Sequence, residues 1–148
     1  MRICLITDFF VPHYHGGGER RFYEILKRLV KRHEITVVCM RVKGVADNEL
    51  IDGILVHHIG PTIEKPPERG TLDFIRFLVA SFFWILWHDY DIVDSQGIAR
   101  IAVAFACRFR KAKSIATVYD LSSGKSDQWI GEAKKYSRFA DKVERFSM

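Results

Sequence analysis

The chain has 148 residues, a net charge of +5 at pH 7, and three cysteines. The length fits one domain that can bury a core, and 48% hydrophobic and 28% charged residues are ordinary shares for a soluble globular protein. Each cysteine stands alone in an apolar run, which excludes a disulfide framework and predicts buried free thiols in a reducing compartment. The basic balance points to an anionic partner: a phosphate ligand, a lipid surface or nucleic acid.

The first third of the chain alternates between strand and helix patterns. RICLITDFF (residues 2–10) is an apolar run rich in β-formers and predicts a buried strand. From Glu19 apolar residues recur at helical spacing while basic residues face outward, which predicts an amphipathic helix. EITVVCM (34–40) and GILVHHIG (53–60) predict the second and third buried strands.

After a proline-containing loop, the pattern predicts an apolar helix from about Thr71 to Trp87. Its run of 14 residues, FIRFLVASFFWILW, carries an arginine and falls short of the roughly 20 apolar residues that a membrane span needs. A buried or interfacial helix is therefore expected. YDIVDSQG (90–97) predicts a strand, IARIAVAFACRFRK (98–111) a helix, and SIATVYD (114–120) another strand. A polar loop and a helix over about residues 127–139 follow.

This alternation predicts an α/β fold with a doubly wound parallel sheet, covered by helices on both faces. Ligands bind at the carboxyl ends of the strands in such sheets. The segments 7–18, 94–97 and 119–124 are therefore expected to share one rim, where a ligand would bind.

Three consecutive glycines, Gly16, Gly17 and Gly18, lie between the first strand and the first helix. Backbone N–H groups and the positive helix end favour a phosphate or another anion at such a place. A tight turn without a ligand is the alternative, because glycine also relieves steric limits on the backbone. A dinucleotide is not expected, since Arg21 stands where the GxGxxG fingerprint needs its third glycine.

Other motifs carry weaker signals. SSGKS (122–126) lacks the first glycine of a P-loop, so a flexible polar loop is expected there. Asp89–Asp91 precede their strand and predict a helix-to-strand turn at the wrong end of the sheet for a metal site. The basic residues are spread over several helices without interleaved aromatics, so no nucleic-acid binding is predicted.

The histidines need separate treatment. His13 and His15 flank the glycines, and a His-x-His pair can hold zinc, but no further ligands cluster with them in the sequence. We therefore predict no metal. His57 and His58 alternate on the third strand, so at most one of them can point inward.

Four motifs in order resemble the N-terminal half of a family 4 glycosyltransferase, a retaining, nucleotide-sugar-dependent enzyme of the GT-B fold. They are ITDFFVPHYHGGGERRFYEILKRLVKRHEITVVC (6–39), YDIVDSQG (90–97), SIATVYDL (114–121) and ADKVERFS (140–147). The last favours a break near Asp141 and a short strand, whereas periodicity alone would continue the preceding helix. The resemblance implies that residues 1–148 form a Rossmann-like acceptor-binding domain excised from a longer protein, inactive without its C-terminal donor-binding domain.

The resemblance also implies roles for particular residues. The glycine loop would close over the donor diphosphate, and donor or acceptor binding would fall to His15, Gly16, Gly17, Gly18, Glu19, Asp94, Gln96 and Gly97. Tyr119 and Asp120 would stand at the catalytic position, with Asp120 binding or orienting a sugar hydroxyl. Tyr119, like Asp94 and Gln96, replaces a histidine of the family motif. No cofactor or metal is implied, because fixed dipoles and positive charge would stabilise the leaving group.

The implied partners are a nucleotide sugar, a sugar or lipid-linked acceptor and, through the basic helix and the FFWILW segment, an anionic membrane. The expected location is the cytoplasm, with peripheral contact at the inner face of the membrane. The replacement at Tyr119 leaves an alternative open, a non-catalytic module that recognises a sugar phosphate or a partner protein.

Overall fold

The computed structural model describes residues 1–97 and 99–118. Several sequence predictions fall outside these residues: Tyr119, Asp120, the 122–126 loop, the 127–139 helix and the 140–147 strand. Residues 1–117 form one compact unit, to which all the following observations refer.

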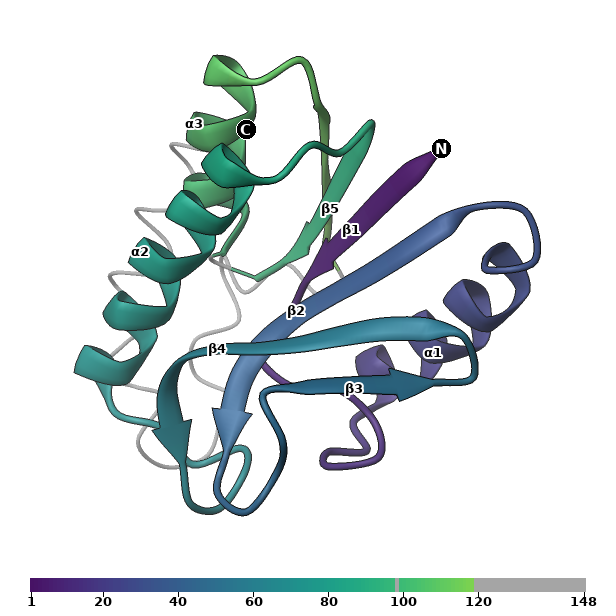
Figure 1. Ribbon diagram of the computed structural model, residues 1–148. Coiled ribbons are helices and arrows are strands. Elements are labelled where there is room, and N and C mark those ends of the chain that lie inside the picture. The colour runs from purple at the N-terminus through teal and green to yellow at the C-terminus, as the bar shows by residue number, and fades with distance from the viewer. Residues whose placement is uncertain (98, 119–148) are drawn as a thin grey trace. The chain divides into compact units, whose positions relative to one another are not determined.

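A six-stranded sheet runs through this unit in the order β3-β4-β2-β1-β5-β6 (Figure 1). Its strands are β1 (Arg2–Ile6), β2 (Glu34–Val42), β3 (Asn48–Ile51), β4 (Ile54–Ile63), β5 (Ile92–Gln96) and β6 (Lys113–Thr117). Every neighbouring pair is parallel except β3 and β4, which are antiparallel. The predicted α/β class with a doubly wound sheet is confirmed, with one antiparallel edge strand added.

Helices cover both faces of the sheet (Figure 1). α1 (Gly17–Leu29) packs on one face, while α2 (Thr71–Trp87) and α3 (Ala99–Phe109) lie together on the other. α1 is strongly amphipathic and buries Phe22 and Leu26, as its spacing predicts. The predicted helix at residues 98–111 corresponds to α3, which buries mainly small side chains against the sheet.

Strand residues alternate between the two layers of the core. Along β1, Cys4 and Ile6 belong to the cluster beneath α2 and α3, whereas Leu5 belongs to the cluster beneath α1. A strand buried on both faces needs apolar residues throughout, which is why these segments are continuous apolar runs in the sequence. All three cysteines are buried free thiols, as predicted.

Two predicted strand boundaries are corrected. β1 ends at Ile6, although the apolar run continues, because Phe9 and Phe10 are buried from a loop instead of a strand. β4 continues past the predicted end through Pro61 to Ile63, and its pairing with β2 shifts register between Met40 and Arg41. A bulge of this kind lets a strand accommodate extra residues such as Gly60 and Pro61.

The hairpin between β3 and β4 was not predicted. Its turn consists of Asp52 and Gly53, both at positive φ (49° and 84°), which is the backbone of a type I′ turn. The Asp-Gly pair is the signal that sequence reasoning missed, because β3 has only four residues within a polar stretch. The turn lies against α1, where Lys27 Nζ is 3.1 Å from Asp52 Oδ2.

We predict that Gly53→Ala lowers the free energy of unfolding by about 1–3 kcal/mol, because a side chain is strained at this positive φ. The added Cβ would also lie 3.2 Å from Cγ2 of Val30. Denaturant unfolding measures the loss. Gly17→Ala is the control, since a Cβ there meets no described atom within 4 Å and should cost no stability. Equal stability of Gly53→Ala and the wild type would contradict the turn assignment.

Candidate functional site

The carboxyl ends of β1 and β5 lie side by side, and β6 continues the same edge. Ile6 pairs with Ser95, and Ser95 pairs with Ala116, so the loops after these strands leave the sheet at one rim. The prediction of a shared rim is confirmed for residues 7–18 and 94–97. Its third part, 119–124, lies outside the described residues.

The glycine loop ends at the N-terminus of α1, as the sequence indicates. Gly16 is the N-cap residue with extended backbone, and Gly17 is the first residue of the helix. A Cβ on Gly16 would collide with Oε2 of Glu19 and lie 3.0 Å from a ring carbon of Tyr14. A Cβ on Gly17 would meet nothing within 4 Å in the described part of the chain. A Cβ on Gly16 would therefore require the side chains of Glu19 and Tyr14 to shift, whereas a Cβ on Gly17 would require no described side chain to move.

Asp94 lies one strand away from this loop and contacts β6. Both oxygens of its carboxylate accept a hydrogen bond from Oγ1 of Thr117, at 3.0 and 3.1 Å. Burial raises the pKa of Asp94 above its usual value, although the bond from Thr117 favours the charged form and acts in the opposite direction. Asp94 is thus a partly buried carboxylate that is costly to ionise.

Gln96 and Gly97 complete the end of β5. Nε2 of Gln96 is buried and has no hydrogen-bond partner among residues 1–97 and 99–118. Gly97 has a φ of 56°, so the chain needs glycine there to leave the strand, whether or not a ligand binds. An unpaired buried amide nitrogen is unusual in a folded protein, and because this group only donates, a hydrogen-bond acceptor of a ligand would suit it.

An ion pair at the start of the loop after β1 was missed by sequence reasoning. Nη2 of Arg69 lies 2.5 Å from Oδ2 of Asp8, and the guanidinium also contacts the rings of Phe9 and Phe74. Burial raises the pKa of Asp8, although the charge and hydrogen bond of Arg69 act against this shift. Because Arg69 comes from the loop after β4, no local pattern in the sequence places its charge near residue 8.

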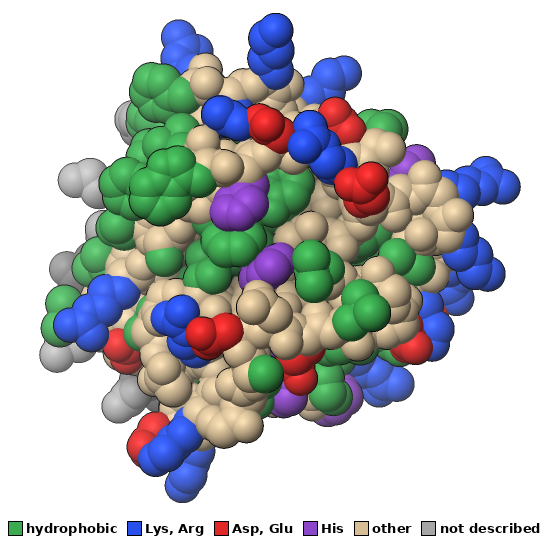
Figure 2. Space-filling model, in the orientation of Figure 1, with side chains coloured by type: hydrophobic (Ala, Val, Ile, Leu, Met, Phe, Trp, Pro, Cys, Tyr) green, Lys and Arg blue, Asp and Glu red, His purple; other side chains and the backbone are tan. Residues whose placement is uncertain are grey.

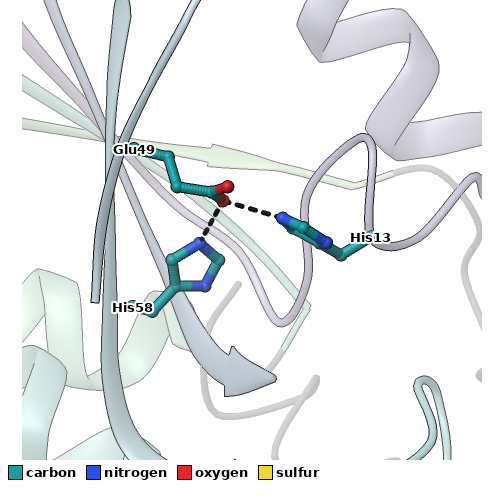
Figure 3. Close-up of side chains that lie close together, drawn as sticks. All are labelled: His13, Glu49 and His58. Atoms are coloured by element: carbon teal, nitrogen blue, oxygen red, sulfur yellow. Dashed lines mark hydrogen bonds and ion pairs between the residues drawn. The ribbon is translucent and has the colours of Figure 1, made fainter. Parts of the chain in front are cut away.

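A second cluster was also missed. His13, from the loop after β1, and His58, on β4, both point at one oxygen of Glu49, on β3 (Figure 3). The Nε2 atoms lie 2.7 Å (His13) and 3.0 Å (His58) from this oxygen. Burial alone raises the pKa of Glu49, but the hydrogen bonds and charges of the two histidines outweigh burial and lower it. His58 is buried and His57 is not, which agrees with the prediction that at most one points inward.

A groove of about 790 Å³ opens between the loop after β1, helix α1 and the β3–β4 hairpin. The predicted site residue His15 lines it, together with Glu49 of the histidine cluster. The remaining lining residues are Val11, Pro12, Arg20, Tyr23, Glu24, Leu50, Ile51 and Asp52.

Helix α2 presents an apolar stripe to the outside. In Figure 2 hydrophobic side chains gather on the side of the molecule where α2 runs in Figure 1. The stripe follows helical spacing and consists of Leu72, Ile75, Val79, Phe83 and Trp87. Among the helices of the described residues, none combines the length and the apolar character needed to cross a membrane.

The carboxylates Asp89 and Asp91 lie at the opposite end of the sheet, between α2 and β5, as predicted. Arg110 pairs with Asp89, and the backbone N–H of Arg2 donates to Asp91 at 2.7 Å. Both carboxylates therefore have structural partners in the turn.

Comparison with known proteins adds the deciding observation. The family model described as Glycosyltransferase Family 4 matches residues 15–148, from the glycine loop to the last residue. The chain belongs to glycosyltransferase family 4. The resemblance drawn from the four motifs is thereby confirmed, and the rim carrying the glycine loop is the rim of a family 4 glycosyltransferase domain.

A solved structure shows the same fold for this family 4 chain. It is sucrose-phosphate synthase from Thermosynechococcus elongatus, which aligns with a TM-score of 0.74 at 14% sequence identity. The alignment covers 98% of this chain and 39% of that one, so the family 4 chain spans well under half of the synthase. A comparison with functionally curated proteins found no match.

We predict a pH-dependent effect of Asp94→Asn on stability. Because burial raises the pKa of Asp94 in the folded protein, the wild type loses stability as the pH rises from about 4 through that raised value. The neutral amide avoids this loss and can still accept the bond from Thr117. The free energy of unfolding of Asp94→Asn relative to wild type should therefore increase with pH, as measured by denaturant unfolding.

Thr117→Val supplies the control for this experiment. It removes a hydrogen bond that favours the charged form of Asp94, so the pKa of Asp94 rises further. The loss of stability that accompanies ionisation of Asp94 should therefore extend to higher pH. A relative stability of Asp94→Asn that falls as the pH rises would contradict the assignment.

Proposed function

We propose that this chain is the N-terminal, acceptor-side domain of a retaining glycosyltransferase that uses a nucleotide-sugar donor. In this proposal residues 1–148 work with a separate donor-binding domain of the same protein, and their glycine loop lies near the donor diphosphate. The observation that carries the proposal is Gly17, a glycine for which the described residues offer no packing reason at the start of a helix. The small share of the synthase covered by this chain agrees with a domain that needs a partner domain.

The position of Gly17 suits a diphosphate on electrostatic grounds. The N-terminal end of α1 carries the positive end of the helix dipole, and an anion there is stabilised by about 0.3–1 kcal/mol or more. Glu19 already places a carboxylate over Gly16, so the protein itself fills this position with a negative group. The Glu19 side chain is flexible and would turn aside for a bound diphosphate, or accept a hydrogen bond from a sugar hydroxyl.

Arg69 is a further source of positive charge in this proposal. It is fixed beside Asp8 and between two aromatic rings at the same rim. Fixed charges and dipoles stabilise a developing leaving-group charge without reorganising during the reaction. The transfer step is accordingly proposed to need no metal. Tyr119 and Asp120 remain proposed catalytic residues on the strength of the family motif.

The end of β5 is proposed to bind the acceptor or the transferred sugar. Asp94 offers carboxylate oxygens and Gln96 offers an amide N–H without a described partner. Carboxylate and amide groups recognise sugar hydroxyls because a hydroxyl both donates and accepts hydrogen bonds. Gly97 lets the chain turn away at this point and leaves room beside the rim.

The test is sugar transfer by the protein that joins this domain to its donor-binding domain, assayed with a panel of nucleotide sugars. Gly17→Ala should lower kcat/KM at least about tenfold, equivalent to about 1.4 kcal/mol of transition-state binding, without changing the unfolding midpoint. Arg28→Ala is the control, because its side chain pairs with Glu24 on the exposed face of the same helix.

Unchanged transfer by Gly17→Ala would remove the proposed role of the glycine loop. Binding of a sugar phosphate by the intact protein with no transfer from any donor would instead support the second candidate, a non-catalytic recognition module.

In the same proposal the stripe on α2 contacts an anionic lipid surface at the cytoplasmic face of a membrane, where a lipid-linked acceptor would be found. The stripe includes Trp87 at 76% exposure and a stacked Phe83–Trp87 pair, and the chain carries a net charge of +5. Apolar contact and attraction of basic residues act together in such binding.

We predict that the 148-residue chain co-sediments with vesicles rich in phosphatidylglycerol. The double variant Phe83→Ser/Trp87→Ser should bind at least about tenfold more weakly, since each large apolar side chain contributes about 1.5–3 kcal/mol when it leaves water. Leu50→Ser is the matched control, because Leu50 is 73% exposed on β3 and does not belong to the α2 stripe. Equal binding of the double variant and the wild type would refute the contact.

A further inference from the structure

Three side chains from three separate segments converge on one point at the edge of the sheet (Figure 3). The Nε2 atoms of His13 and His58 and a carboxylate oxygen of Glu49 all lie within 4.8 Å of one another. His13 lies 36 residues from Glu49 in the sequence, and His58 lies 9 residues from it. His13 belongs to the loop at the rim, whereas Glu49 and His58 come from the β3–β4 hairpin.

The two ring nitrogens of His58 face different neighbours. Nδ1 lies 3.1 Å from the backbone oxygen of Met40, and Nε2 lies 3.0 Å from Oε2 of Glu49. Both neighbours are acceptors, whereas a neutral imidazole has a single N–H to donate. With the proton on Nδ1, the lone pair of Nε2 faces the carboxylate. In this tautomer a metal ion between Nε2 and the carboxylate would be coordinated by both groups. In the other tautomer Nε2–H donates to Glu49, and Nδ1 accepts from the thiol of Cys39, 3.4 Å away.

The geometry suits a metal ion well. Zinc binds histidine nitrogen and carboxylate oxygen at about 2.0–2.2 Å, so tetrahedral ligand atoms stand about 3.3 Å apart. The Nε2 atoms of His13 and His58 lie 2.7 and 3.0 Å from Oε2 of Glu49, so small adjustments bring them to this spacing. Two histidines with one carboxylate also leave a fourth position for water.

The surroundings of His58 resemble the outer shell of metal sites. A ligating histidine usually donates its other N–H to a carbonyl or carboxylate, which fixes the ring and its tautomer. The Met40 carbonyl is in this position, and His58 is only 2% exposed. The nearby Cys39 is not part of the cluster, because its sulfur lies 3.4 Å from Nδ1 of His58, whereas Nε2 of this ring faces Glu49.

The site is also accessible from solvent. The side chains of His13 and Glu49 are 22% and 26% exposed, and Glu49 lines the groove beside α1. An ion can therefore enter without opening the core, and a water molecule in the groove can occupy the fourth position.

We propose that His13, Glu49 and His58 bind a zinc ion, which fastens the loop after β1 to the β3–β4 hairpin. The ligands are Nε2 of each histidine and one carboxylate oxygen of Glu49. This loop leads directly to Gly16 and Gly17, so the ion fixes the base of the glycine loop without touching the reacting groups. The proposal does not depend on the proposed function.

The test is zinc binding by the 148-residue chain after treatment with a chelator, followed by calorimetric titration with Zn²⁺. Wild type should bind one ion at this cluster, and His13→Ala and Glu49→Gln should each weaken binding at least about tenfold. His57→Ala is the matched control, since His57 is the neighbouring histidine on the opposite face of β4, and this variant should bind like wild type. Co²⁺ in place of Zn²⁺ should give a tetrahedral absorption spectrum in wild type and in His57→Ala, and no such spectrum in His13→Ala or Glu49→Gln.

Thermal unfolding separates a binding defect from a folding defect. Without metal, His13→Ala should unfold close to wild type, because His13 lies in a partly exposed loop. With Zn²⁺, the wild-type midpoint should rise and that of His13→Ala should not, since binding to the folded state alone is stabilising. Absence of zinc binding, unchanged affinity in His13→Ala and Glu49→Gln, or an equal loss in His57→Ala would each overturn the proposal.

Discussion

Two adjacent phenylalanines determine where the chain goes when it leaves the central strand. Phe9 is buried in the layer beneath α2 and α3, and Phe10 is buried in the layer beneath α1. Burying each ring contributes roughly 1.5–3 kcal/mol, so the loop is held from both sides of the sheet at once. The ring of Tyr14 packs against Phe9 and that of Tyr23 against Phe10, with ring centroids 5.7 and 6.4 Å apart. The loop that carries the glycines, His13 and Asp8 is therefore anchored to the core, and its position at the rim follows from that anchoring.

This anchoring explains why the sequence predicts the fold better than the site. A strand buried on both faces must be apolar throughout, so the parallel strands and their helices are visible in local patterns. The edge strand β3 is short and exposed on one side, and local composition does not separate it from a loop. The sequence signal for this strand is the Asp52-Gly53 pair, which favours the positive φ angles of a two-residue turn. The hydrophobic pattern does not indicate the strand.

The site depends on long-range contacts, which local patterns do not contain. Arg69 reaches Asp8 across 61 positions in the sequence, and His13 reaches Glu49 across 36. The pattern at His57 and His58 predicts that at most one faces inward, which is confirmed, but it does not indicate what the inward histidine meets. The glycines show the same limit. Gly16 and Gly17 look equivalent in the sequence, yet within residues 1–97 and 99–118 a Cβ on Gly16 would meet neighbouring side chains and a Cβ on Gly17 would not.

The register of the β3–β4 hairpin limits where residues can be inserted in its strands. Glu49 and His58 meet because they project from the same face of two antiparallel strands, in a register set by the two-residue turn. Side chains alternate between faces along a strand, so inserting one residue into either strand would send Glu49 and His58 to opposite faces. Surface hairpins usually tolerate insertions, but this one would lose the contact between Glu49 and His58. Related chains that keep both side chains in contact must therefore also keep the pairing register of the two strands.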